Sequence, residues 1–150
     1  MENRNLEILR QNLISLEKSL FRMNRSFEKA KSIEPAKEIS DDDFDILENL
    51  TSRFSRTVDL IVNKLFRSID SVELEDAGTL IDVVNRAEKR GIIRSSLKVR
   101  RLKDLKNEIV YEYETEDLAA LFERTLESTP EVLAIGKSVK KYCLEKEYIE

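Results

Sequence analysis

The scarcity of helix-breaking residues limits the fold of this chain more than any other feature. Only three glycines and two prolines interrupt its 150 residues, and these are the residue types at which helices most often end. Between the interruptions, apolar residues recur at steps of three and four, which is the spacing of one helix face. We therefore predict an all-α fold, an up-down helical bundle of about five to six helices.

The first helix is expected over residues 5–31, where apolar residues form a heptad seam. The seam consists of Leu6, Leu9, Leu13, Leu16, Leu20, Met23 and Phe27. About three heptads in a short chain more often pack inside a bundle than form a free coiled coil, so we expect the seam to dock onto the rest of the domain. The alternative is a helical adaptor whose first helix grips a helix of another protein.

The remaining helices are placed by their apolar stripes and end signals. A second long helix is expected to begin near Asp41, with acidic residues in its first turn. A third should span residues 75–90 and stop at Gly91, and a fourth should start near Ser95 or Ser96. Thr115 and Thr129 resemble N-caps of two further helices, the second with Pro130 in its first turn. The second helix should bury Phe44, Leu47, Leu50, Phe54, Val58, Ile61, Leu65, Phe66 and Ile69.

Length and composition indicate one globular domain over residues 1–150. The chain is 41% hydrophobic and 37% charged, and its apolar runs are far shorter than the roughly 20 residues that cross a bilayer. It opens with no signal peptide, so we expect a cytoplasmic protein without a membrane partner. One cysteine, Cys143, and no histidine leave no disulfide and no Cys/His zinc cluster. No metal and no cofactor are expected.

Charge is unevenly distributed along the chain. Nine basic residues and only two acids, Glu88 and Asp104, lie between positions 86 and 106, and the following twenty residues are strongly acidic. Clustered lysine and arginine attract phosphate, which would make this stretch a surface for RNA or a nucleotide. Solvated helix faces explain the same pattern equally simply. The basic residues are Arg86, Lys89, Arg90, Arg94, Lys98, Arg100, Arg101, Lys103 and Lys106.

The basic stretch leads into a signature segment, residues 102–113, with the sequence LKDLKNEIVYEY. At about 100° per residue on a helix, Leu102, Leu105, Ile109 and Tyr113 form one apolar stripe. Lys106 lies at the edge of that stripe. Asn107 and Tyr111 fall one turn apart on the polar side, together with Arg100 and Asp104.

The signature segment resembles the Arg-Asn-x-x-x-His-x-Tyr motif of HEPN-domain proteins, such as the HepT-type ribonuclease toxins. Asn107 and Tyr113 match the motif, whereas Lys106 replaces its arginine and Tyr111 its histidine. The likeness extends to SRFSRTVDLIVNKLFRSID, GTLIDVVNRAEKRGII and TEDLAALF, so that it covers roughly half of the chain. It implies a homodimer in which two motif helices line a shared cleft. It also implies a toxin–antitoxin pair with a minimal nucleotidyltransferase, which in HepT-type members can modify the motif tyrosine, here Tyr113.

The two replacements change the chemistry that the resemblance implies. Active members cut RNA without a metal through the histidine and the arginine. Tyrosine, with a pKa of about 10 against about 6.5 for histidine, is a poor general base, and lysine lacks the planar fork of arginine. We therefore expect a ribonuclease-deficient dimeric module that binds a nucleotidyltransferase partner, RNA, or both. Its degenerate catalytic positions are Lys106 and Tyr111, and its binding residues are Asn107, Tyr113, Arg100, Arg101 and Lys103.

The alternative is an active HepT-type toxin, a metal-independent endoribonuclease. In that interpretation Lys106 and the two motif tyrosines, Tyr111 and Tyr113, form the cleft of the dimer. Lys106 acts as the base after burial has lowered its affinity for the proton.

Overall fold

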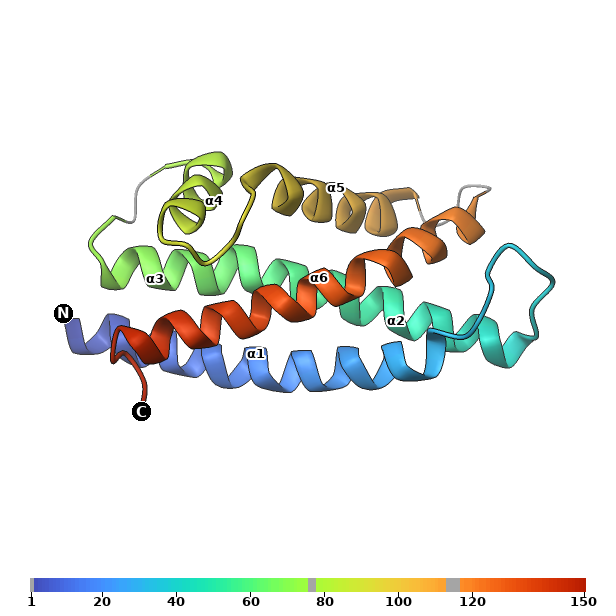
Figure 1. Ribbon diagram of the computed structural model, residues 1–150, viewed down its shortest axis with the longest axis horizontal. Coiled ribbons are helices and arrows are strands. Elements are labelled where there is room, and N and C mark those ends of the chain that lie inside the picture. The colour runs from blue at the N-terminus through green and yellow to red at the C-terminus, as the bar shows by residue number, and fades with distance from the viewer. Residues whose placement is uncertain (1, 76–77, 113–116) are drawn as a thin grey trace.

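The computed structural model describes residues 2–75, 78–112 and 117–150, and its regular structure within these ranges is entirely helical (Figure 1). The helices are α1 (Glu2–Ala30), α2 (Asp41–Asp59), the π-helical segment η1 (Leu60–Phe66), α3 (Arg67–Val72), α4 (Leu80–Lys89), α5 (Ser96–Glu112) and α6 (Leu118–Glu145). Because η1 joins α2 directly to α3, these three elements run on as one rod over residues 41–72. The prediction of an all-α up-down bundle is confirmed.

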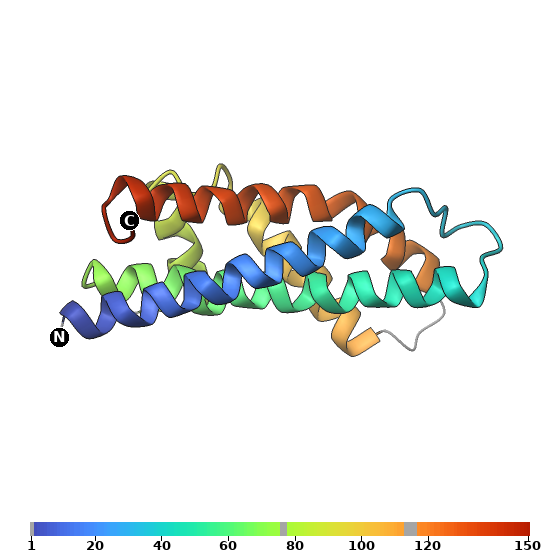
Figure 2. The ribbon, with the colours of Figure 1, turned by 90° about the horizontal axis from the view of Figure 1, so that it is seen from below.

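The bundle is organised around this rod. Helix α1 runs antiparallel to it, and α6 returns in the direction opposite to α1 while contacting both (Figures 1 and 2). The shorter helices α4 and α5 pack on the rod from another side, where α4 contacts η1 and α3, and α5 contacts α2. Both chain termini lie at the same end of the bundle (Figure 2). The rod is therefore the one element that all the other helices share.

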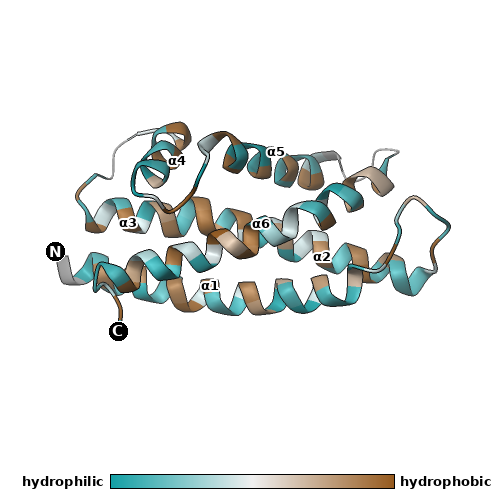
Figure 3. Cartoon of the chain, viewed as in Figure 1, coloured by the Kyte–Doolittle hydropathy of each residue, from teal (hydrophilic) through white to brown (hydrophobic). Residues whose placement is uncertain are grey.

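The heptad seam of α1 faces the inside of the bundle. Leu9, Leu16 and Met23 are fully buried, while Leu20 and Phe27 are partly buried against the same core. Figure 3 shows the resulting alternation of hydrophobic and hydrophilic stretches along the long helices. Full burial of one such side chain contributes about 1.5–3 kcal/mol. The packing of this face on the core therefore provides most of the stability of α1 as a helix. The prediction that the seam docks internally is confirmed.

The start of α2 also follows the sequence. Ser40 is the N-cap, and its hydroxyl accepts a hydrogen bond of 3.1 Å from the backbone N–H of Asp43. The first-turn acids Asp41, Asp42 and Asp43 lie at the positive end of the helix dipole. What the periodicity missed is the π-helical segment. Its wider turns bury the neighbouring pairs Ile61–Val62 and Leu65–Phe66 on one side.

The third predicted helix begins later than expected. Helix α4 starts at Leu80, directly after Thr79. The hydroxyl of Thr79 accepts from the N–H of Asp82, and the carboxylate of Asp82 accepts from the N–H of Thr79 at 2.9 Å. This capping box fixes the start of the helix. The predicted end is confirmed, because Gly91 follows the helix with a φ of 78°.

The predicted break at Thr129 and Pro130 is wrong. Helix α6 continues through both residues, and the fully buried hydroxyl of Thr129 donates to the carbonyl of Thr125 at 2.7 Å. Thr129 is therefore bonded one turn back along a helix and caps none. Proline costs a helix interior about 3 kcal/mol, and the packing of α6 on the core offsets this. Thr115 lies outside the described residues, and Asp117 caps α6 through the N–H of Ala120.

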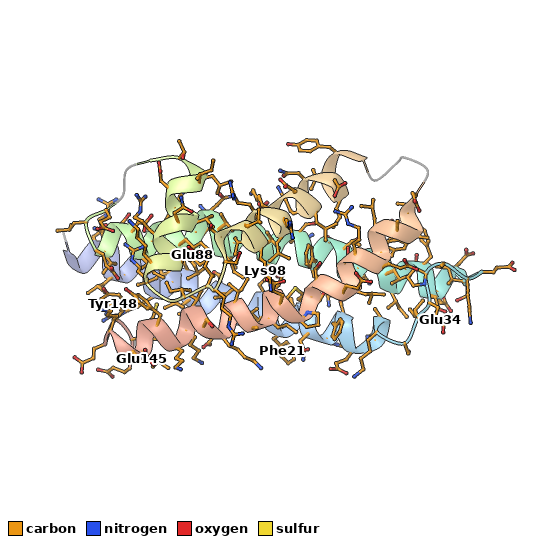
Figure 4. The ribbon with its side chains drawn as sticks, turned by 45° about the horizontal axis from the view of Figure 1, so that its top comes forward. Phe21, Glu34, Glu88, Lys98, Glu145 and Tyr148 are labelled. Atoms are coloured by element: carbon orange, nitrogen blue, oxygen red, sulfur yellow. The ribbon has the colours of Figure 1, made fainter. Side chains whose placement is uncertain are left out.

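A buried ionic network ties α3, α4 and α6 together near the two chain ends. The Asp70 carboxylate, 2% exposed, pairs with Arg86 at 3.0 Å and with Arg90. Arg90, only 9% exposed, also donates from Nε to Glu73 at 2.9 Å. The other oxygen of Glu73 accepts from the hydroxyls of Tyr142 and Tyr148 at 2.6 and 3.0 Å; Tyr148 is labelled in Figure 4.

The tyrosines and the arginine decide the charge of Glu73. Burial by itself raises the pKa of this carboxyl, but the hydrogen bonds from Tyr142 and Tyr148 and the charge of Arg90 hold it below its usual value. Burial and the same carboxylate raise the pKa of Tyr148 to about 12. The network therefore keeps Glu73 ionised and both phenols protonated at neutral pH.

Substitution of Asp70 by alanine should destabilise the fold by about 3–5 kcal/mol, because it removes the carboxylate shared by two largely buried guanidinium groups. The matched control is Arg124→Gln, which breaks the exposed pair with Glu108 at 2.5 Å and should cost no more than about 1 kcal/mol. Urea denaturation of both variants measures the difference. Equal, small losses would show that the Asp70 network contributes little.

Candidate functional site

The signature helix α5 is held on the rod by its apolar stripe. Leu102, Leu105 and Ile109 are buried, as the periodicity predicts, and Val99 extends the stripe toward the start of the helix. At that start the N–H of Ser96 donates to the carboxylate of Glu88 on α4 at 2.8 Å. The position of α5 is therefore fixed by core packing along its length and by a contact with α4 at one end.

The most specific contact of the signature segment is with Asp59 at the end of α2. The Lys103 ammonium lies 2.5 Å from one oxygen of this carboxylate, and the Lys106 ammonium lies 2.9 Å from the other. Both lysine side chains are 14% exposed. Burial raises the pKa of Asp59, but hydrogen bonds and charge from the two lysines outweigh it and hold the pKa below its usual value.

Lys106 also lines a surface groove of about 530 Å³ between α2 and α5. The wall from α2 includes Ser52, Ser55 and Asp59, and the wall from α5 includes Lys106, Ile109 and Val110. The hydroxyl oxygen of Ser55 is buried and has no hydrogen-bond partner among the described residues. The groove thus combines an apolar surface from Ile109 and Val110 with charged side chains of both signs, among them Glu48 and Arg56.

The other signature residues are not gathered around Lys106. The Tyr111 side chain is 80% exposed and that of its neighbour Val110 is 52% exposed, while Asn107 is half-buried. Tyr113, the candidate for modification, lies outside the described residues. Within one chain, the structure therefore unites Lys103 and Lys106 on Asp59 and leaves Tyr111 in solvent, as the predicted separation of faces implies.

Several residues of the basic stretch form ion pairs with carboxylates of the same chain. Arg86 and Arg90 pair with Asp70, and Lys103 and Lys106 pair with Asp59. Arg100 is half-buried on α5, and its Nε has no hydrogen-bond partner in the part of the chain that is described.

Two exposed cations of the stretch have carboxylates beside them. Lys98, labelled in Figure 4, and Arg101 line a cavity that also contains Asp104, Glu127 and Glu131. The expected phosphate-binding surface is therefore smaller and less positive than the sequence suggests.

Asp59 is the site residue that sequence reasoning missed. It lies in the segment SRFSRTVDL, 44 residues before Lys103. Its only signal in the sequence was a single acid near the middle of a long helix. Which of the many acids meets Lys106 depends on how α5 packs on α2, and no spacing within either helix encodes that pairing.

Comparisons of the chain with models of known families, with curated proteins and with solved structures found no match. None of the helices in residues 2–75, 78–112 and 117–150 combines the length and apolar character that crossing a bilayer requires.

The Asp59 carboxyl should titrate below its ordinary pKa of 3.8, and Lys106→Met should shift this titration upward. Because the folded pKa is the lower one, the pair stabilises the fold above about pH 4 and loses that contribution as the pH falls through the folded value. The effect on stability should stay under about 1 kcal/mol, since the carboxylate is partly exposed. NMR titration of the carboxyl carbon measures the shift. Lys106→Arg should restore it, and Lys98→Met should leave it unchanged.

Proposed function

We propose that this chain is a HEPN-like binding module that pairs with a second copy of itself through α5 and is deficient in ribonuclease activity. The dimer binds a minimal nucleotidyltransferase partner, with RNA as a further ligand. The observation that carries the proposal is the exposure of Val110 and Tyr111 beside the groove between α2 and α5. These residues belong to the segment that resembles the HEPN motif.

Exposed apolar and aromatic side chains favour a docked partner at this face. Tyrosine is enriched in protein interfaces because it adds large contact area at little entropic cost. The walls of the groove carry both Glu48 and Arg56. A twofold contact brings the same patch of both copies together. The acid of each copy can then pair with the arginine of the other. Dimerisation would also bring the two α5 helices to a shared cleft, as the resemblance implies.

The contacts of Lys106 argue against catalysis. A general base must be neutral before it can accept a proton, whereas the Lys106 ammonium forms a 2.9 Å ion pair with Asp59. The chain contains no histidine to take over this role. Tyr111 offers a hydroxyl for hydrogen bonds, and the charge of Lys106 is balanced by Asp59. Such a set of groups suits binding better than bond cleavage.

Between the two ligands, the charges favour the protein partner. Nucleic-acid binding relies on cations that replace counterions on phosphates. Four of the nine residues in the basic stretch already pair with Asp59 or Asp70, and carboxylates line the same cavity as Lys98 and Arg101. A nucleotidyltransferase that binds beside α5 would also be close in sequence to Tyr113, the motif tyrosine that it could modify.

Replacement of Val110 by aspartate should convert the dimer to a monomer, because two negative charges would be buried against each other across the twofold axis. Ile81→Asp is the matched control, since Ile81 is similarly exposed but lies on α4. Light scattering after size exclusion gives the mass of each protein. A monomeric wild type, or equal masses for both variants, would contradict dimerisation through α5.

The pure wild-type protein should not cleave RNA in the presence of a chelator at neutral pH. The double variant Lys106→Arg, Tyr111→His restores the family's two catalytic residue types and should cleave faster by about 10²–10⁴-fold, the usual contribution of a general acid–base group. Tyr111→Phe in the Lys106→Arg background is the control without an imidazole. Strong cleavage by the wild type that Lys106→Ala abolishes would instead establish the active toxin.

A further inference from the structure

A second pocket lies far along the rod from the ionic network of Asp70. Of the described residues, three basic side chains and no carboxylate line it. It has a volume of about 200 Å³ and is formed by Arg25, Ser26 and Lys29 of α1 with Ile46, Asn49 and Arg53 of α2. Its residues come from the last part of α1 and the first part of α2, on either side of the loop that joins these helices. Its basic residues lie outside the basic stretch of residues 86–106, and no pattern in the sequence indicates that they meet.

Helix geometry explains why these residues share one pocket. On α1, Arg25 and Lys29 are four residues apart, and on α2, Asn49 and Arg53 are also four apart, which places each pair on one face of its helix. Arg53 is held in position by two hydrogen bonds from its Nη1, to the carbonyl of Arg22 at 3.1 Å and to the hydroxyl of Ser26 at 2.9 Å. The guanidinium group is therefore anchored across the two helices before any ligand arrives.

The charge of this pocket distinguishes it from the groove between α2 and α5 and from two cavities beside α6. Within the described ranges, Arg25, Lys29 and Arg53 form no ion pair with a carboxylate. The groove between α2 and α5 includes Glu48 and Asp59, and the cavities beside α6 include Glu131. Three full positive charges thus line this small pocket in a chain of net charge −4.

We propose that this pocket binds the phosphate group of a small molecule. Arginine presents a planar fork of N–H donors that matches phosphate oxygens, and lysine adds a point charge. Asn49 and Ser26 supply further polar groups in the same walls. The carboxyl end of α1 carries only about half a negative charge, which the three cations outweigh.

The size of the pocket sets the ligand class. About 200 Å³ holds roughly seven water molecules at about 30 Å³ each, which is room for a phosphate or a pyrophosphate group. A nucleic-acid strand needs an extended track of cations along several successive phosphates. The pocket is therefore a site for a terminal phosphate group. It is independent of α5 and of the function proposed for that helix.

Calorimetric titration with inorganic phosphate and with pyrophosphate tests the site, with a short RNA oligonucleotide as a separate arm. Pyrophosphate should bind more tightly than phosphate, and Arg25→Gln and Lys29→Gln should each weaken its binding by about tenfold, the usual effect of one charge-assisted hydrogen bond. Both residues are exposed, so these variants should keep the stability of the wild type. Lys18→Gln, an equal charge change at an exposed site two turns away, should bind like the wild type.

Several results would overturn the proposal. One is the absence of binding at millimolar pyrophosphate, and another is an equal loss of affinity in Lys18→Gln, which would indicate general charge attraction. Binding of the oligonucleotide alone would replace the small molecule with a nucleic acid. Because Val110→Asp leaves this pocket untouched, that variant should bind pyrophosphate normally, and the outcome therefore stays separate from that of the dimer test.

Discussion

The apolar surface of the rod over residues 41–72 is the constraint on which the rest of the structure depends. Helices α1, α4, α5 and α6 all contact it, so its buried side chains form the common wall of the core. The π-helical segment Leu60–Phe66 widens that wall in the middle of the rod, where α1 and α4 also pack. Because the rod is continuous, the end of α2 that carries Asp59 is rigidly placed beneath α5.

Two carboxylates of the rod determine which cations face solvent. Asp59 and Asp70 lie eleven residues apart, and each binds two basic side chains from the helices packed above. Desolvation makes a lone buried carboxylate costly, so Asp70 requires nearby cations in the folded state, whereas Asp59 is partly exposed and depends on its lysines less. Ion pairing with these two carboxylates thus explains part of the basic stretch. Its likeness to a phosphate-binding surface is correspondingly reduced.

The same reasoning separates the two candidate sites. At the groove between α2 and α5, the charge of Lys106 is balanced by Asp59, and the walls also carry Glu48, Arg56 and the exposed Val110. At the pocket between α1 and α2, three cations meet without a carboxylate among its lining residues. The first arrangement suits a protein partner and the second an anion. Both sites use the same stretch of α2, and they stay separate because they lie on different faces of that helix.

The sequence by itself determined the helices and their buried faces, because both follow from residues a few positions apart. The heptad seam of α1, the start of α2 near Asp41 and the stripe of α5 all depend on local spacing and capping. The sequence prediction was wrong about the start of α4, which the Thr79–Asp82 capping box fixes. It was also wrong about a break at Pro130, where core packing keeps α6 continuous. Only the tertiary structure decided which charges meet, since Asp59 with Lys106 and Arg25 with Arg53 come from different helices. Such pairings depend on how rigid helices cross, which no periodicity within one helix records.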